Sequence, residues 1–327
     1  MATITNLILP TSASDHLRPF DVRRDLRPTA DLVELCFADT LDPDGERYLR
    51  QMRSAANSAG LLRWAAATAE WTSVPLTGYV WEEDGKLVGN VSLITFALHG
   101  RRNYLIANVA VHPDFRRRGI ARSLTQRAIE HARQRGAQST WLHVREENDA
   151  AISLYRSLGY NERARRTTWF SQPGMPLDSL PADVTVGPRR TRFWQTQKNW
   201  LKYHYPPELT WHLPINMNSL RPGITGFLYR ILTGAVINQW AAQRDDRLSG
   251  VLSWQATRTY ADTLWLASSP QEEDTAAFSL LLYARQHLSP RRPLSLDYPA
   301  HHASEAIRAA GFRVHQTLIW MEREFNH

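Results

Sequence analysis

Apolar positions recur with two different periods along the first half of the chain. Short runs rich in β-branched and aromatic residues predict strands, whereas apolar residues three or four positions apart predict helices that pack against a core. The predicted strands are Phe20–Arg23, Gly78–Trp81, Lys86–Leu93, Tyr104–Val111 and Thr140–Val144. The predicted helices are Thr29–Phe37, Ile120–Arg135 and Asn148–Leu158. Strands and helices in this order indicate an α+β fold, a mixed and mostly antiparallel sheet flanked by helices.

Turn-forming residues mark where these elements end. Glu83–Gly85 lies between two predicted strands and favours a tight hairpin turn. Tyr104–Val111 has the composition of a buried central strand, and His112-Pro113 ends it. We interpret His112 as a residue that caps or shapes this turn. Gly136 and Gly159 stand where two of the predicted helices stop.

The second half of the chain repeats this order. The matching segments are Asp246–Ser253 with Gly85–Ser92, Leu264–Pro270 with Asn108–Pro113, Leu294–Asp297 with Trp141–Val144, and Ala303–Phe312 with Ala151–Tyr160. A helical run, Thr275–His287, lies at the place of the long helix of the first half. Repetition on this scale indicates two tandem copies of one fold.

Proline and glycine cluster between the two copies, at Ser171–Pro176 and again at Gly187-Pro188. We therefore predict a first domain over residues 1–172, a linker over 173–188 and a second domain over 189–327. A chain of 327 residues is long enough for two separate cores.

Composition and charge narrow the class of protein. With 43% hydrophobic residues and no apolar run long enough to cross a bilayer, we expect no membrane partner. Met1–Ser14 lacks the features of a secretory signal and Cys36 is the single cysteine, so we expect a cytoplasmic location. The net charge of +7 comes mostly from dispersed arginines, which disfavours a nucleic-acid partner and suits a phosphate-rich small ligand.

The segment Val109–Arg122 has the features of an anion site. It places a buried strand, a basic loop and the start of a helix in direct succession. Free backbone N–H groups and the positive end of the helix dipole favour a pyrophosphate at such a place, and Gly119 allows close approach because it has no Cβ. Without further signals, an exposed basic turn before a surface helix would explain the segment equally well.

Two signatures decide between these interpretations. Arg116-x-x-Gly119-x-Ala121 resembles the Q/R-x-x-G-x-G/A signature of the GNAT superfamily of N-acetyltransferases. Asn148, Ala151, Tyr155 and Gly159-Tyr160 are similar to the second family segment, N-x-x-A-x-x-x-Y-x-x-x-G-F/Y. The chain thus resembles a tandem GNAT protein.

This resemblance implies that acetyl-CoA is the cosubstrate and that no metal is required. In the family, the strand that corresponds to Val109, Ala110 and Val111 splays from its neighbour and pairs with the pantetheine arm. The resemblance further implies that Asn148, preceding Ala151, hydrogen-bonds the pantetheine region, although a helix N-cap is an equally good role for it. The loop residues expected at the pyrophosphate are Arg116, Arg117, Arg118, Gly119, Ile120, Ala121 and Arg122.

The implied reaction is direct attack of an uncharged amine on the acetyl carbonyl. Tyr155 would act as general acid toward the departing thiolate, unless it only packs its ring. The backbone N–H of Val109 would polarise the carbonyl. No cysteine nucleophile is needed, and Cys36 on the apolar side of an early helix is expected to be a structural thiol.

The general base is not defined by the sequence. Many family members place a carboxylate near the central strand, but Asn108 stands before Val109 here and cannot accept a proton at neutral pH. The remaining candidates are His143, Glu146, Glu34 and Asp39.

The second copy is expected to have lost the chemistry. Its counterpart of the basic loop, Ser268–Thr275, has no glycine and carries three acidic residues, which repel phosphates. Ile307 stands at the position of Tyr155. We interpret this copy as a structural partner in an internal pseudo-dimer, in a chain that is a monomer or a homodimer. Its aromatic segment Trp194–Trp211 either belongs to the core or lines the acceptor site.

The expected function is acetyl transfer to a primary amine of a small molecule or a peptide. The acceptor would contact the variable segment Phe37–Trp71, which contains no interpretable motif. The alternative is a non-catalytic module on the same scaffold that senses acyl-CoA or binds nucleic acid.

Overall fold

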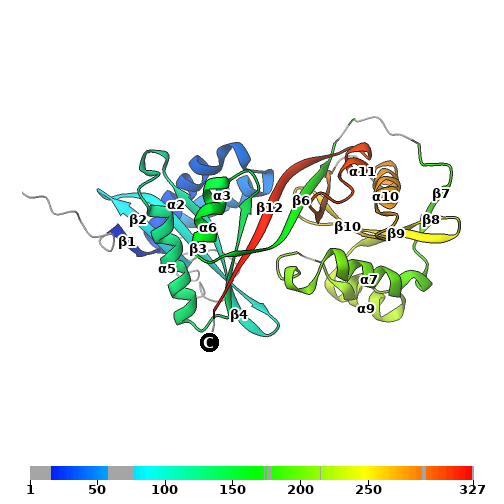
Figure 1. The fold of residues 1–327 in the computed structure, drawn as a ribbon, viewed down its shortest axis with the longest axis horizontal. Coiled ribbons are helices and arrows are strands. Elements are labelled where there is room, and N and C mark those ends of the chain that lie inside the picture. The colour runs from blue at the N-terminus through cyan, green and yellow to red at the C-terminus, as the bar shows by residue number, and fades with distance from the viewer. Residues whose placement is uncertain are drawn as a thin grey trace, which may run out of the picture. The chain divides into compact units, whose positions relative to one another are not determined.

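The computed structural model describes residues 16–57, 77–172, 174, 179–213, 215–288 and 292–325. The chain forms two compact units, coloured mainly from blue to green and from green to orange in Figure 1. The first unit comprises Met1–His143, Ala150–Asn161 and Met321–His327, and the second comprises Val144–Asp149 and Glu162–Trp320. Parts of three predicted features lie outside the described residues, namely Met1–Ser14, the acceptor segment beyond residue 57 and the linker at residues 173 and 175–178.

The first half of the chain forms most of the predicted strands and helices, together with the unpredicted helix α3. Its main elements are β1 (Leu17–Pro19), α2 (Val22–Phe37), α3 (Pro43–Ala56), β2 (Thr77–Glu83), β3 (Lys86–Leu98), β4 (Arg101–Val111), α5 (Ile120–Gln134), β5 (Ser139–Arg145) and α6 (Asp149–Ser157). The strands lie in the order β1-β2-β3-β4-β5. All neighbours are antiparallel except β4 and β5, which are parallel. This is the mixed sheet that the sequence predicts.

Helices cover both faces of this sheet. On one face, a Cβ at Gly89 of β3 would lie 2.9 Å from Ile120 and 3.0 Å from Leu124, so the glycine lets α5 pack closely. On the other face, Ala110 of β4 joins the apolar cluster of α2 and α3. Residues 110 and 111 therefore face opposite sides of the sheet, and the start of α5 lies on the side of Val111.

The predicted hairpin turn is confirmed. Asp84 and Gly85 connect β2 to β3 with φ of 49° and 74°. Two consecutive residues with positive φ form the two-residue turn that matches the twist of the strands. The second half has an equivalent turn at Asp245 and Asp246, with φ of 47° and 59°.

The predicted start of the chain's first helix is wrong. The strand expected over Phe20–Arg23 does not form. Strand β1 ends before it, at Pro19, and α2 already begins at Val22. The Asp21 carboxylate accepts a hydrogen bond from the Arg23 amide at 2.9 Å and so caps the helix. Pro28 lies inside α2, although a proline there removes one helical hydrogen bond. Packing of Leu26 and Ala30 in the core compensates for this loss.

The second half repeats the plan. Its main elements are β6 (Asn161–Ser171), β7 (Val184–Pro188), α7 (Trp194–His204), α8 (Met217–Leu220), α9 (Gly223–Thr233), β8 (Ile237–Arg244), β9 (Arg247–Gln255), β10 (Asp262–Ser268), α10 (Glu273–His287), β11 (Leu294–Pro299), α11 (Ser304–Ala309) and β12 (Phe312–Glu324). Six of its strands lie in the order β6-β11-β10-β9-β8-β7. Each segment predicted to repeat the first half forms the expected element.

The compact units do not coincide with a division at residues 173–188. Val184–Pro188, assigned to the linker from the sequence, forms β7 and pairs with β8. The C-terminal residues Met321–His327 belong to the first unit, where the Phe325 amide donates to the Gln138 carbonyl at 2.9 Å. The Arg323 guanidinium donates to the Leu158 carbonyl at 2.7 Å. The first unit therefore includes the end of the chain.

Candidate active site

The parallel strands β4 and β5 pair along only part of their length. The pairs run from Asn103–Ser139 to Ile106–Leu142, and among the described residues no β4–β5 pair follows. From Ala107 to Val111, β4 continues as a strand with its other edge on β3. Among the described residues, Ala107–Val111 therefore has no partner strand on its β5 side.

A β-bulge lies in this unpaired segment. Pairing between β3 and β4 shifts between Ser92–Ala107 and Asn90–Ala110, so that two residues of β4 oppose one of β3. Asn108 has φ of 50°, which is unusual for a residue other than glycine. Its carbonyl accepts a hydrogen bond from Asn90 Nδ2 at 3.0 Å. A bulge re-aims the backbone of its strand, and here it lies directly before Val109, the expected oxyanion donor.

The loop after β4 is held in a defined shape. The His112 amide donates to the Val88 carbonyl at 2.9 Å, and the His112 ring accepts from the Asp114 amide at 3.3 Å. The interpretation of His112 as a turn-shaping residue is thus confirmed. Arg116 Nε donates to the Val111 carbonyl at 3.2 Å, which anchors the beginning of the basic loop to the end of β4.

Gly119 occupies the N-cap position of α5. Its φ is 79°, and a Cβ added there would meet no atom within 4 Å. The first amides of a helix have no intrahelical acceptor, and here no side chain caps them. Arg117 also has positive φ, 64°. The loop thus combines a left-handed backbone, open space and free helical amides, which are the elements of an anion site.

A pocket of about 280 Å³ opens at this loop. Its lining comprises the end of β4, the basic loop, the start of α5 and one side of α6, namely Val111, Phe115, Arg116, Arg117, Gly119, Ile120, Ala121, Arg122, Ala150 and Leu154. Three of these residues are arginines and none is acidic, so the pocket has the charge that a diphosphate requires.

Arg118 differs from its neighbours. Its guanidinium lies 3.6 Å from the Glu83 carboxylate, covers the Phe115 ring at 4.8 Å and is absent from the pocket lining. Arg122 lines the pocket and donates to Ser157 Oγ at 2.8 Å, which ties α5 to α6. The arginines of the loop therefore divide into those that face the pocket and one that stabilises the loop.

Tyr155 lies on α6, one residue after Leu154 of the pocket lining. Only 7% of Tyr155 is exposed, and its ring meets Tyr160 edge-on with centroids 6.1 Å apart. Burial raises the pKa of the Tyr155 hydroxyl to about 12, so it holds its proton at neutral pH. The hydroxyl makes no hydrogen bond to another described residue. By contrast, the Tyr160 hydroxyl bonds Thr140 Oγ1 at 2.8 Å.

The residues proposed to orient substrate or accept a proton have different surroundings. Asn148 immediately precedes α6, at the N-cap position. Its backbone N–H donates to the Arg145 carbonyl at 3.0 Å. His143 follows Leu142, the last residue of β5 that pairs with β4. Glu146 forms an ion pair with Arg165 and lies 3.5 Å from His301 Nε2. The Glu146 side chain therefore already contacts two neighbouring side chains.

The two candidates of the opening segment lie on its surface. Glu34 pairs with Arg53 at 2.6 Å, and this hydrogen bond lowers the pKa of Glu34. Asp39 is exposed in the short turn after α2. Of the four candidate bases, His143 is the one on the strand beside the unpaired segment of β4. The Cys36 thiol donates to the Val111 carbonyl at 3.3 Å, and burial raises its pKa, as expected for a structural thiol.

A polar cluster beside the bulge is a feature that sequence reasoning missed. Asn90 and Ser92 on β3 are buried, and their side chains lie 3.3 Å apart. The Tyr48 hydroxyl of α3 is buried, and burial raises its pKa to about 12. The Asn108 side chain acts in the opposite direction and lowers this pKa. The polar residues at otherwise apolar positions of β3 could have indicated this cluster from the sequence. No sequence pattern indicated Tyr48, because only the fold brings α3 to the bulge.

The second unit separates its parallel strands in the same way but fills the gap. Pairing of β10 with β11 ends at Leu264–Leu296. Beyond it, the Leu266 amide donates to the Tyr205 hydroxyl at 3.3 Å, and His204 Nε2 lies 3.1 Å from Ser268 Oγ. Both aromatic residues come from the end of α7 and are fully buried. The segment Trp194–Trp211 thus contributes to the core, although Tyr203 is 62% exposed.

The start of α10 is acidic where the start of α5 is open. Glu272 occupies the N-cap position, and Glu273 and Asp274 form the first turn. Ser249 Oγ donates to the Glu272 carboxylate, and Tyr298 donates to Glu273 at 2.7 Å. Ile307, the counterpart of Tyr155, is completely buried. Side chains of this unit thus occupy the places that stay open in the first.

Two further observations concern the described residues only. No three His, Cys, Asp or Glu side chains gather in an arrangement that could hold a metal ion. None of the helices has the length and apolar character needed to span a bilayer.

Comparisons with known proteins relate part of the chain to one family. A model of the GNAT acetyltransferase family matches residues 42–160. Over 63 residues the chain is 48% identical to the ribosomal protein bS18-alanine N-acetyltransferase of Salmonella typhimurium, over 19% of this chain and 43% of that protein. An uncharacterized N-acetyltransferase of Methanocaldococcus jannaschii is 37% identical over 94 residues, which are 28% of this chain and 42% of the relative. The first half of the chain is therefore similar to GNAT acetyltransferases.

A solved GNAT structure extends the comparison to nearly the whole chain. The GCN5-related N-acetyltransferase from Sphaerobacter thermophilus aligns over 95% of this chain and 96% of its own, with a TM-score of 0.56 and 17% identity. This likeness concerns the fold alone. In sequence, the chain spans less than half the length of the two GNAT relatives above.

Proposed function

We propose that the first unit is an acetyl-CoA-dependent N-acetyltransferase with one active site per chain. The observation that carries the proposal is the open, positively charged pocket at Gly119, which begins where β4 loses its partner strand. A diphosphate and an extended thioester arm require these two features side by side. The named relatives, which are N-acetyltransferases, support an amine as the acceptor.

The fit to acetyl-CoA can be stated residue by residue. Arg116, Arg117 and Arg122 would neutralise the diphosphate, while the amides from Gly119 onward bind its oxygens. The free edge of Ala107–Val111 would pair with the amides of the pantetheine arm. Asn148 would hold the same arm from the start of α6. Bound acetyl-CoA supplies an acetyl group activated as a thioester.

The chain's own groups then perform the transfer. The Val109 amide, set by the bulge at Asn108, holds the negative charge that develops on the acetyl oxygen. The acceptor nitrogen forms its bond to the acetyl carbon while the carbon–sulfur bond breaks. Tyr155, which is protonated at neutral pH, gives its proton to the sulfur. His143, directly or through water, accepts the proton that the nitrogen loses, because Asn108 cannot.

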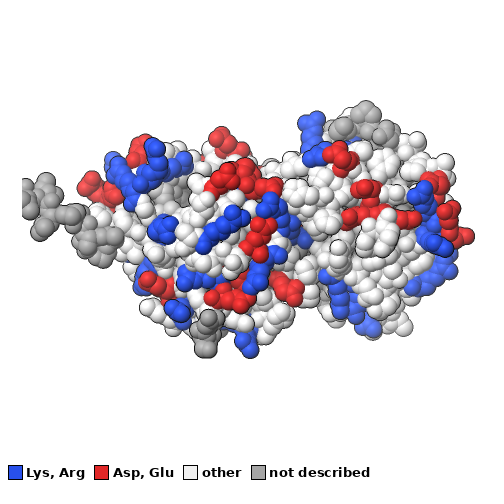
Figure 2. All heavy atoms as spheres, in the orientation of Figure 1, with Lys and Arg blue, Asp and Glu red and all other residues white. Residues whose placement is uncertain are grey.

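The second unit is proposed to be a scaffold without its own cosubstrate site. Among the described residues of the second unit, neither an open, positively charged pocket nor an open strand edge occurs at the corresponding place. Aromatic side chains fill the gap between β10 and β11, and acidic residues surround the start of α10. The acceptor is proposed to be a primary amine of a small molecule or a peptide. Interspersed Lys, Arg, Asp and Glu over the first unit in Figure 2 do not favour nucleic acid as a ligand.

Titration calorimetry with acetyl-CoA tests the proposal. We expect one site per chain, lost in Gly119→Glu because a carboxylate then occupies the diphosphate position. Gly100→Glu is the matched control, since Gly100 also has positive φ, 74°, and open space around it. Two equal sites, or equal effects of both substitutions, would contradict the assignment. A chain that binds acetyl-CoA but acetylates nothing in a screen of small amines and peptides would instead be a sensor.

A further inference from the structure

Helix α9 of the second unit exposes an apolar surface. Among the described residues, its large apolar side chains are more than half exposed, and Ile224 and Leu232 reach 78% and 84%. The members of this apolar α9 face are Ile224, Phe227, Leu228, Ile231 and Leu232, with Val236 just after the helix at 57%. A contiguous apolar surface of this kind marks an interaction site rather than ordinary surface variation.

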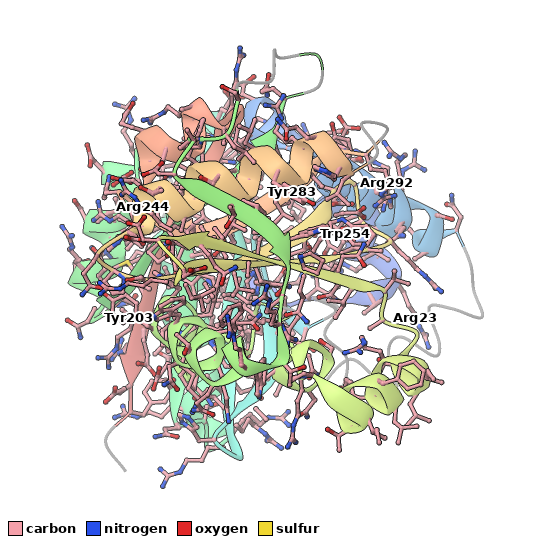
Figure 3. The ribbon with its side chains drawn as sticks, turned by 90° about the vertical axis from the view of Figure 1, so that its right-hand side faces the viewer. Arg23, Tyr203, Arg244, Trp254, Tyr283 and Arg292 are labelled. Carbon is pink, nitrogen blue, oxygen red and sulfur yellow. The ribbon has the colours of Figure 1, made fainter. Side chains whose placement is uncertain are left out.

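Helix α9 is held against the segment that precedes it by a buried glycine and an arginine. Gly226 is the one residue of α9 that is buried, and a Cβ there would lie 1.8 Å from the Arg221 carbonyl. Arg230 donates to the Ser219 and Arg221 carbonyls at 3.0 and 3.1 Å. In Figure 3, α9 lies below the strands, and side chains on it point away from them. The apolar residues therefore do not hold the helix in place.

The surrounding sequence is strongly basic. Residues 184–244 contain eight Lys and Arg and one acidic residue, Glu208, so this fifth of the chain has a formal charge of +7. That equals the net charge of the whole protein. The remainder of the chain is therefore neutral overall, and the excess positive charge belongs to the segment that carries the apolar helix.

A pocket of about 800 Å³ lies at the start of α9. Its lining includes two cations, Lys198 and Arg221, the Trp194 ring and the apolar residues Met217 and Ile224, but no acidic residue. A site of this composition accepts an anionic head group next to apolar chains. It adjoins the apolar α9 face through Ile224.

We propose that the apolar α9 face and the adjoining pocket dock this protein on an anionic phospholipid surface. The apolar side chains enter the acyl boundary, and Lys198 and Arg221 contact the phosphates. A second copy of the chain would bring two basic segments together, which is electrostatically unfavourable. Nucleic acid would leave the apolar face exposed. The expectation that the protein has no membrane partner was based only on the lack of an apolar run long enough to cross a bilayer. It did not take binding at the membrane surface into account.

Vesicle co-sedimentation of the full chain tests this docking. We expect binding to phosphatidylcholine vesicles containing about a third phosphatidylglycerol, little binding to pure phosphatidylcholine, and release in high salt. Phe227→Gln and Leu232→Gln should each weaken binding about tenfold, since each removes a large inserted side chain. Lys198→Gln should weaken it about fivefold.

The control is Val314→Gln, which replaces an apolar residue that is 45% exposed on β12 and should leave vesicle binding unchanged. Circular dichroism verifies that each variant is folded. The proposal would be overturned if the wild type failed to bind anionic vesicles. It would also be overturned if a variant that combines Phe227→Gln with Leu232→Gln bound them as well as the wild type. A dimer in sedimentation velocity that the α9 variants dissociate would identify a second copy as the occupant and equally overturn it.

Discussion

The two halves of this chain separate a pair of parallel strands at equivalent places and use the gap in opposite ways. Beyond Ile106, β4 borders a pocket lined by arginines. Beyond Leu264, β10 meets the Tyr205 and His204 side chains. Strand separation alone therefore does not make a cosubstrate site. A strand can bind a ligand there only if the protein's own side chains do not already hydrogen-bond to its unpaired backbone groups.

The largest expected effect concerns the proposed acid of the first unit. Tyr155→Phe should lower turnover with an accepted amine about 10² to 10⁴-fold, because the thiolate then leaves without a proton donor. Affinity for acetyl-CoA in calorimetry should change little. Tyr160→Phe is the control, since it removes a hydroxyl that bonds Thr140, and it should reduce stability rather than turnover. Equal turnover of Tyr155→Phe and wild type would remove Tyr155 from the acid role.

The next effect concerns the filled gap of the second unit. Arg166 is 3% exposed, pairs with Asp297 and donates to the His204 carbonyl at 2.8 Å. Arg166→Met should lower the free energy of unfolding by about 3 to 5 kcal/mol, because Asp297 keeps a poorly solvated charge. Arg244→Met, which breaks a surface pair with Asp183, should cost less than about 1 kcal/mol. Similar urea midpoints for both variants would show that the buried pair is unimportant.

A smaller effect should appear on mild acidification. Burial lowers the pKa of His204 and of His212 in the folded protein below the value of about 6.5 in an unfolded chain. The unfolded state therefore binds protons first, so their contribution is complete above pH 6.5 and declines as the pH falls toward the folded values. Hydrogen-exchange protection factors, which correct for the intrinsic slowing of exchange at lower pH, should decrease around α7 between pH 7 and pH 5.5.

The region around α2 provides the contrast for this acid test. Burial alone would raise the pKa of Asp25, but hydrogen bonds from Arg18, at 2.6 and 2.9 Å, hold it below the usual value. Its contribution persists until the pH falls below about 3.9. Protection factors around α2 should thus stay constant over the range in which α7 loosens. A parallel loss of protection in both regions would argue against the histidines as the cause.

The smallest effect tests whether the gap can be reopened. Tyr205→Phe removes the acceptor of the Leu266 amide and should cost about 1 kcal/mol of unfolding free energy. Calorimetry should still find one acetyl-CoA site, since the ring continues to fill the gap and the acids of α10 remain. A second site in this variant would mean that one hydroxyl group separates scaffold from enzyme.

Local signals account for what could be predicted from the sequence. The turn at Asp84–Gly85, the loop at Gly119 and the helices α5 and α6 depend on residues near one another in the chain. The start of α2 was missed because Phe20–Arg23 was assigned to a strand, whereas the cap at Asp21 and the packing of Leu26 and Ala30 in the core stabilise a helix. Tyr48 beside Asn108 and Tyr205 beside Leu266 join distant segments. No local pattern encodes such contacts, so the sequence predicted the loss of the second cosubstrate site from its acidic loop and Ile307 but did not predict the filled gap.

The contribution of residues 323 and 325 to the first unit has a consequence for biosynthesis. Phe325 and Arg323 bond to Gln138 and Leu158, so the first unit lacks part of its structure until these two residues have been translated. A nascent chain that has emerged as far as residue 172 would carry every proposed catalytic group and yet be incomplete. A truncated protein of that length is expected to be less stable than a chain that includes residue 325.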